Sequence, residues 1–330
     1  MLTEKENFLR LLRGEMPEFL PRYDLMHWNV FGSPYKNEVT PEGIEIDEFG
    51  LKHKTSPESM GGFMPLPGFV LLDDITKWRD IIKTPDTSKF EWEAWCKEQL
   101  KDKDTVNNPV SVMIGDYFMK IVNFMSVTEG LIALYEEPEE CYALCEYLSD
   151  YYVEVLKNEI YYFKPDVLHL ADDVAAGQMP FIDLETYRKV IKPHHKRLAD
   201  IALDNGMLIS MHCCGKCEMF LDDFIDLGVT AWEPAQVSND LLAIKKKYGP
   251  KLAIMGGWDN TGPISMPETS DEELRDALVH YVDTFAPGGG FAYHASVATG
   301  FGEEEYKRKM AICDEVYNTY ARDWYKNHAG

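Results

Sequence analysis

The sequence feature that most constrains the fold is an alternation of short apolar segments and longer helical segments, which becomes regular after residue 108. Short apolar strands joined by helices are typical of a parallel sheet that is buried on both faces. The predicted strands cover residues 20–27, 109–114, 167–170, 207–211, 229–232, 252–255 and 291–294. The predicted helices cover residues 4–13, 183–205, 218–227, 239–248, 271–285 and 303–326, with two more between 127 and 163.

A doubly wound open sheet would show the same alternation, but two observations favour a (β/α)₈ TIM barrel. Polar residues repeatedly follow the strands, at the end where barrel active sites are built. No G-x-G-x-x-G motif follows the first strand. The chain has 330 residues, 45% of them hydrophobic, and can bury one large core. We therefore expect residues 1–330 to form a single α/β domain, with an irregular excursion around residues 40–67.

The formal net charge of −23 limits the partners that the chain can have. A strongly negative protein repels nucleic acid and anionic membrane surfaces, so neither is expected as a partner. No stretch resembles a signal peptide, and no segment approaches the roughly 20 apolar residues that span a bilayer. The seven cysteines, three of them between 213 and 217, are typical of reduced thiols. We expect a cytoplasmic protein.

His212 and Cys214 form the strongest local signal for chemistry. They leave the end of a predicted strand two positions apart, so their side chains point the same way. An imidazole nitrogen and a thiolate at this spacing can bind one Zn²⁺. A buried histidine beside small core cysteines is the alternative. The C-x-x-C spacing of Cys214 and Cys217 could also serve redox exchange, but that role needs a thioredoxin-like context that the flanking units do not provide.

A catalytic zinc site needs three protein ligands and one open position, and the residue pattern leaves the third ligand open. Glu233 ends the next predicted strand, and His294 lies near the end of the last one. Each has a structural alternative: Glu233 as a carboxylate that accepts backbone hydrogen bonds, His294 as a packed core residue.

Further polar residues at strand ends are candidates for the same mouth. Asp172 and Asp173 are adjacent, so at most one of them faces the site, where it could act as a catalytic or orienting group; a helix N-cap is the alternative. Gln178 follows in a loop that could cover the pocket. Trp258 and Asp259 follow two glycines and are predicted to bind substrate.

Several segments of the chain resemble the uroporphyrinogen decarboxylase superfamily. They are FLRLLRGEMPEFLP at 8–21, the region 166–193 with YRKVIKP, the H-x-C-G at 212–215, KLAIMGGWDN at 251–260, and the glycine run at 288–290. The resemblance covers nearly the whole chain and implies a (β/α)₈ barrel. The superfamily contains true decarboxylases and corrinoid-linked zinc methyltransferases. Decarboxylases carry an arginine-rich stretch after the first strand, whereas this chain has no arginine there after Arg22.

The methyltransferase branch shares the H-x-C that His212 and Cys214 match. Its third zinc ligand is commonly a cysteine near the last barrel strand, but this sequence has no cysteine between Cys217 and Cys313. His294 is the nearest replacement by position. Related zinc methyltransferases also use a glutamate after the H-x-C, so Glu233 is a candidate as well.

The resemblance implies a zinc-dependent methyltransferase that works with a corrinoid carried on a separate protein. Zinc in such enzymes can activate a thiol acceptor or help a methyl group leave an oxygen. Because the third ligand differs from the usual one, we expect the second role, with a methyl ether or another methylated small molecule as the donor, as in an O-demethylase. A metal-independent decarboxylase that acts on a less anionic substrate is one alternative. A non-catalytic ligand-binding barrel is another.

Overall fold

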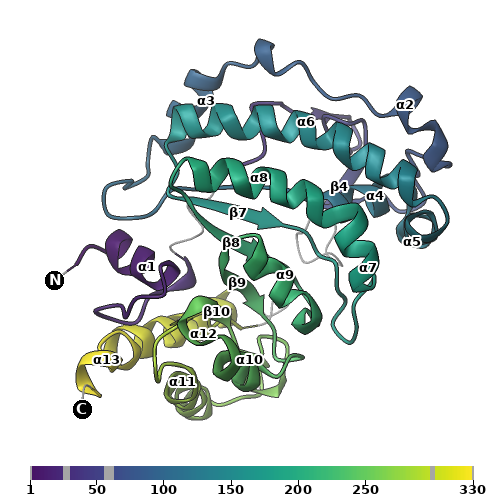
Figure 1. Cartoon of the computed structure of the whole chain (residues 1–330). Coiled ribbons are helices and arrows are strands. Elements are labelled where there is room, and N and C mark those ends of the chain that lie inside the picture. Colours follow the sequence, from purple (N-terminus) through teal and green to yellow (C-terminus); the bar gives the residue numbers. More distant parts are fainter. Residues whose placement is uncertain (1, 25–29, 56–62, 298–301, 329–330) are drawn as a thin grey trace.

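The computed structural model describes residues 2–24, 30–55, 63–297 and 302–328. Its centre is a parallel sheet of seven strands in the order β1-β6-β7-β8-β9-β10-β11. The successive strands β7 to β10 can be followed in Figure 1. The strands are β1 (Val30–Phe31), β6 (Ser111–Ile114), β7 (Val167–Ala171), β8 (Leu208–His212), β9 (Val229–Ala235), β10 (Ala253–Gly256) and β11 (Phe291–Ala292).

The segment that precedes β1 pairs with the chain just after β11, the strand at the other edge of this sheet. Arg22 forms a parallel bridge with Tyr293, just after β11, and the backbone N–H of Tyr23 donates to the carbonyl of Tyr293 at 2.9 Å. Of the predicted strand 20–27, the described residues 20–24 form only this isolated bridge, and residues 25–27 lie outside the described residues. The α/β class with a parallel sheet is confirmed. Seven strands of that sheet, rather than the eight expected, lie in the described part of the chain.

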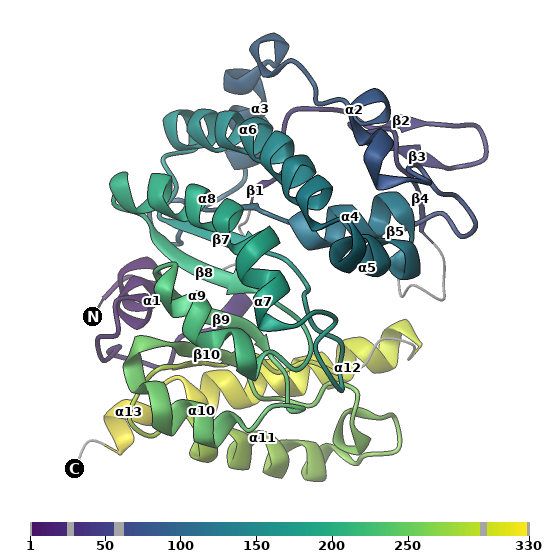
Figure 2. The same ribbon diagram turned by 45° about the vertical axis from the view of Figure 1, so that its right-hand side comes forward.

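Helices cover the outside of the sheet in sequence order, from α6 and α8 beside β7 to α11 and α12 beside β10 (Figure 2). Most predicted boundaries hold within a few residues, and the helix expected over 271–285 begins at a capping box between Ser270 and Glu273. The helices are α4 (Tyr117–Met125), α5 (Val127–Glu136), α6 (Pro138–Phe163), α7 (Leu184–Thr186), α8 (Lys192–Asp204), α9 (Leu221–Asp226), α10 (Leu241–Tyr248), α11 (Asp271–Phe285), α12 (Glu303–Val316) and α13 (Trp324–Asn327).

Two separate clusters of buried side chains show which ends of the strands are covered and which are accessible. The larger cluster fills the space between the sheet and its outer helices. The smaller one lies inside the sheet, where Val167, Ala253 and Met255 pack against Phe8 and Leu11 of helix α1 (Glu4–Leu12). Val167 opens β7, so α1 covers the amino ends of the strands. The carboxyl ends are left for the site, as in other barrels.

The segment expected to be irregular contains a second, antiparallel sheet. Its strands are β2 (Glu38–Val39), β3 (Glu45–Ile46), β4 (Lys52–Thr55) and β5 (Phe63–Pro65). The turn between β3 and β4 is held by Asp47, whose Oδ1 accepts hydrogen bonds from the N–H groups of Phe49 and Leu51. The ring of Phe49 lies 5.6 Å from that of Phe124 in α4, which anchors the turn on the main body. The excursion thus contains short strands, and the two-residue strands β2 and β3 leave almost no periodic pattern in the sequence.

Two short helices, α2 (Trp78–Ile81) and α3 (Trp92–Leu100), connect the antiparallel sheet to β6. Within the described residues, no single helix is both long and apolar enough to cross a bilayer; helices α4 and α5 would reach that length only as a pair bent by 116°.

Candidate functional site

The end of β8 brings His212 and Cys214 together as their spacing predicts. The Sγ of Cys214 lies 3.6 Å from the Nε2 of His212. The chain then turns at Gly215, whose φ of +85° favours glycine. A Cβ at this position would lie 2.4 Å from the carbonyl oxygen of Ala176, so a larger residue would push the β7 loop away from the site.

Asp173 completes a set of three ligand atoms from two neighbouring strands. Its Oδ1 accepts a hydrogen bond from the backbone N–H of Cys214 at 2.7 Å and lies 3.7 Å from the Nε2 of His212. The carboxylate of Asp173, the imidazole of His212 and the thiol of Cys214 all offer ligand atoms within 4.8 Å of one another. All three side chains are partly exposed, so the set is open to solvent and to a substrate.

The opposite nitrogen of His212 faces the buried carboxylate of Glu233. The Nδ1 of His212 is 2.7 Å from Glu233 Oε1, and the Nε2 of His169 is 2.6 Å from the same oxygen. The hydroxyl of Tyr23 donates to Glu233 Oε2 at 2.9 Å. Because a carboxylate only accepts, His212 donates through Nδ1, and its Nε2 faces Cys214 and Asp173; this nitrogen offers a metal its lone pair once its proton is lost.

The electrostatics of this network follow from burial and hydrogen bonding. Burial alone would lower the pKa of His212, but its hydrogen bonds to Cys214 and Glu233 outweigh burial and raise that pKa to about 11. Burial would raise the pKa of Glu233, yet hydrogen bonds from His169 and His212 hold it well below its usual range. Burial raises the pKa of the Cys214 thiol, and His212 opposes that effect. Glu233 is therefore an ionised anchor for two imidazoles.

His169 is a site residue that the sequence reasoning missed. It lies in β7, where strand alternation puts it on the same face as Ala171, and its Nδ1 is 2.5 Å from the hydroxyl of Ser210, its partner in the register with β8. The signal was available: a polar residue in the middle of a strand that is otherwise apolar, two positions before the rim. Such a residue in a buried strand requires a hydrogen-bond partner.

The two adjacent carboxylates separate, as their alternation predicts. Asp172 points away from His212 and is buried, and its two oxygens accept hydrogen bonds from the N–H groups of Phe118 and Met119 at 2.8 and 3.0 Å. It thus caps the first turn of helix α4 from a neighbouring strand, the structural alternative considered for it.

The remaining predicted site residues contribute no atom to the ligand set. The ring of His294 packs against Tyr23, with centroids 4.0 Å apart. In the described residues, His294 belongs neither to the set of Asp173, His212 and Cys214 nor to a second possible group of His169, His212 and Glu233. Trp258 donates through Nε1 to the carbonyl of Ser296 at 2.7 Å. Asp259 accepts from the N–H of Thr261.

Gln178 is exposed, in a loop between Ala175 and Pro180, which form a bridge. Cys217 is buried, with its Sγ 3.3 Å from that of Cys213, and lies outside the ligand set.

The ligand set fits the requirements of Zn²⁺. In a tetrahedral zinc site with typical bond lengths, a histidine nitrogen and a cysteine sulfur lie about 3.5 Å apart. The observed separation of 3.6 Å between His212 Nε2 and Cys214 Sγ matches that geometry. Three protein ligands leave a fourth position open, and the hydrogen bond from Nδ1 to Glu233 is the support that zinc-binding histidines usually have.

Comparisons with known proteins agree with this architecture. A methyltransferase of known structure from Methanosarcina mazei superposes with a TM-score of 0.67 over 96% of this chain and 100% of that chain, at 13% sequence identity. A methylated-thiol–coenzyme M methyltransferase from the same organism is 22% identical over 232 residues, which are 69% of this chain. The chain spans 59% of the length of that relative.

Both similar proteins carry methyltransferase names, in agreement with the branch that the H-x-C motif indicates. Residues 112–299, more than half of the chain, match the family described as Uroporphyrinogen decarboxylase (URO-D). The matched region runs from β6 past β11 and contains every ligand atom of the site. The chain therefore belongs to the uroporphyrinogen decarboxylase family.

Proposed function

We propose that this protein is a methyltransferase that binds Zn²⁺ and moves a methyl group from a small methylated molecule to a corrinoid carried on a separate protein. The observation that carries the proposal is the convergence of Asp173, His212 and Cys214 at the carboxyl ends of β7 and β8. The methyltransferase names of a sequence relative and a structural neighbour support the reaction type.

In this proposal the third zinc ligand is Asp173, whereas the sequence suggested Glu233 or His294. Glu233 is hydrogen-bonded to Tyr23, His169 and His212, so both of its oxygens already accept hydrogen bonds. Asp173 has one oxygen that accepts no hydrogen bond from the described residues, and its side chain is 32% exposed. A partly exposed carboxylate beside an imidazole and a thiol is the better ligand.

Bound zinc would supply a Lewis acid that polarises the group from which the methyl leaves, or would stabilise a thiolate. The protein's own residues supply the positioning. Glu233 fixes the ring orientation and tautomer of His212, and His169 and Tyr23 fix Glu233 in turn. Asp173 also holds the backbone of Cys214, so the positions of two ligands are coupled.

The metal ligands alone fit a methyl ether and a methylated thiol equally well, so the predicted methyl-ether donor remains a prediction. Decarboxylation of a substrate with many carboxylates is less well supported, because no arginine lines the described cavity beside the metal ligands. We propose that the protein acts in the cytoplasm, since all seven cysteines are free thiols.

The test is the zinc content and methyl transfer of the protein purified without chelators. We expect about one zinc per chain in the wild type and loss of both zinc and methyl transfer to a corrinoid protein in His212→Ala and Cys214→Ser. Glu233→Gln should weaken zinc binding roughly 10–100-fold, as loss of a ligand's hydrogen-bond partner usually does.

Cys96→Ser is the matched control, because its side chain donates to the carbonyl of Tyr162, which a hydroxyl can also do. Full methyl transfer by a metal-free protein would refute the proposal. So would zinc binding that survives in both ligand variants.

A further inference from the structure

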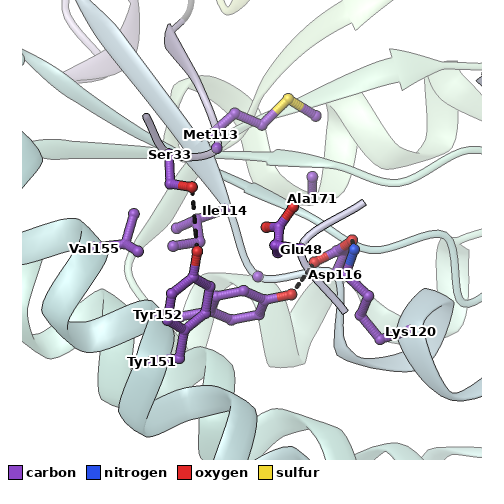
Figure 3. A pocket seen from close by; sticks show the side chains of 12 residues that line it. Ser33, Glu48, Met113, Ile114, Asp116, Lys120, Tyr151, Tyr152, Val155 and Ala171 are labelled. Atoms are coloured by element: carbon purple, nitrogen blue, oxygen red, sulfur yellow. Dashed lines mark hydrogen bonds and ion pairs between the residues drawn. The ribbon is translucent and has the colours of Figure 1, made fainter. Parts of the chain in front are cut away.

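Beside the metal ligands lies a cavity of about 240 Å³ to which neither the sequence nor the family relationship assigns a role (Figure 3). It is bounded by the ends of β6 and β7, by helix α6 and by the turn of the small antiparallel sheet. The polar residues in its wall are Ser33, Glu48, Asp116, Lys120, Tyr151 and Tyr152.

The cavity adjoins the proposed zinc site through neighbouring strand residues. Ala171 lines the cavity, and its partner in the register of β7 and β8 is His212. Met113 also lines the cavity, and its partner in β7 is His169. Neighbouring strands are about 4.8 Å apart, so a small molecule in the cavity lies within reach of the metal ligands.

The carboxylates around the cavity outnumber the ammonium groups among the residues that line it. Lys120 Nζ lies 3.3 Å from Asp116, which also accepts a hydrogen bond from the hydroxyl of Tyr152 at 2.7 Å, and the charge of the same ammonium acts on Glu48 as well. Glu48 forms no ion pair within the described residues. Its side chain points into the cavity near Ala171 (Figure 3). Burial raises the pKa of Glu48, with the Lys120 charge opposing, as expected for a carboxylate removed from water.

Two aromatic rings stand beside this carboxylate. Tyr151 and Tyr152 line the cavity from α6, and their ring centroids are 5.8 Å apart. The hydroxyl of Tyr151 donates to Ser33 at 3.2 Å, so both hydroxyls are held and the rings are fixed in place. A carboxylate next to aromatic rings is the combination that recognises methylated ammonium groups, through charge and cation–π attraction.

We propose that this cavity binds a methylated ammonium group, so that the methyl donor of the proposed reaction is a methylated amine or quaternary ammonium compound. The assignment rests on the proposed function. On transfer, the reduced corrinoid would supply the electron pair of the new bond to the methyl carbon, while the bond between that carbon and nitrogen breaks and its electron pair stays on nitrogen. A neutral amine leaves, so no proton donor is needed at that position. The ammonium nitrogen has no lone pair for zinc, so in this assignment zinc would act as a Lewis acid only on the lone pair that forms on the leaving amine.

Other donor classes match the cavity less well. An anionic donor would be repelled by the carboxylate of Glu48, and the net charge of −23 also favours cations over anions. A neutral methyl ether would fit the volume but would leave the Glu48 carboxylate desolvated without a partner.

The experiment compares the binding of choline with that of its neutral isostere, 3,3-dimethylbutan-1-ol, by titration calorimetry. We expect wild-type protein to bind choline at least about tenfold more tightly than the isostere. Glu48→Gln should remove that preference, while Glu42→Gln, an exposed glutamate that precedes the same hairpin, should keep it. Tyr151→Leu is the second variant, and should weaken choline binding with Glu48 intact. Thermal unfolding of each variant shows that it folds.

Equal affinity of the wild type for the two ligands, or an undiminished preference in Glu48→Gln, would overturn the assignment. The same titration on His212→Ala separates this assignment from the proposed function, because that variant should lose zinc and methyl transfer and still bind choline. A wild-type protein that binds choline but neither binds zinc nor transfers methyl groups would support the cavity site and refute the proposed function. A wild-type protein that binds zinc and transfers methyl groups but does not bind choline would refute the cavity site and leave the proposed function standing.

Discussion

At the scale of single residues, Asp172 and Asp173 illustrate how strand alternation gives neighbours with the same chemistry different roles. Asp172 is buried and satisfies two N–H groups at the start of α4. Asp173 is partly exposed and faces His212 and Cys214. The first carboxylate contributes to stability, and the second offers a ligand to a metal.

Substituting each aspartate in turn should separate these roles. We expect Asp172→Ala to lower the free energy of unfolding of the metal-free protein by about 2 kcal/mol, because two buried N–H groups lose their acceptor. Asp173→Ala should cost less stability and lose zinc. Urea unfolding and metal analysis on the same preparations measure both quantities. If Asp172→Ala lost zinc without loss of stability, the division of roles would be incorrect.

The same scale shows what the sequence could and could not predict about the site. The spacing of His212 and Cys214 lies within one strand, so the period of two residues was enough to bring them together. The third ligand comes from another strand, and its choice depends on register and loop path. The register of β8 and β9 pairs Glu233 directly with His212, so the buried carboxylate of Glu233 lies beside Nδ1 of His212. No local pattern separates that position from the one that Asp173 occupies.

At the scale of elements, the β3–β4 hairpin contributes to the mouth of the larger sheet. Its turn is held by Asp47, which accepts two backbone hydrogen bonds and lies 3.1 Å from the Nε2 of His53. Glu48 follows directly, so the carboxylate in the cavity is positioned by this turn. The small sheet is therefore part of the proposed donor site as well as a surface feature.

A less stable β3–β4 turn should weaken ligand binding in the cavity and leave zinc binding unchanged. We expect Asp47→Ala to weaken choline binding roughly tenfold, which corresponds to about 1.4 kcal/mol, the loss of one or two hydrogen bonds. Zinc content should stay at the wild-type value, because none of the metal ligands lies in the hairpin. Calorimetry and metal analysis test this together. A parallel fall in zinc content would mean that the turn supports the whole mouth.

The elements differ in how well the sequence predicts them. Long helices such as α11 follow the 3.6-residue period and a capping box, and their bounds could be predicted closely. The hairpin strands β2 and β3 have two residues each, too few for a period. Their existence depends on tertiary contacts, such as that of Phe49 with Phe124, which the sequence does not reveal.

At the scale of the whole molecule, the net charge of −23 attracts cations toward the cavity from a distance. Dissolved salt screens such a field, and the screening length falls from about 30 Å at 0.01 M to about 3 Å at 1 M. Raising sodium chloride across this range should therefore weaken choline binding a few-fold and leave the neutral isostere nearly unchanged. Calorimetry at several salt concentrations measures the slope. If both ligands weakened equally, the field would not contribute to recognition.

The bridge between Arg22 and Tyr293 has a consequence for how the protein is made. The backbone N–H of Tyr23 donates to Tyr293 while its hydroxyl donates to Glu233, and the carbonyl of Leu20 accepts from the hydroxyl of Tyr317. Protein synthesis delivers residue 23 early and residues 293 and 317 late. A nascent chain on the ribosome thus contains His212 and Cys214 before the residues that hold Tyr23 have been made. Firm metal loading should then await release of the finished chain.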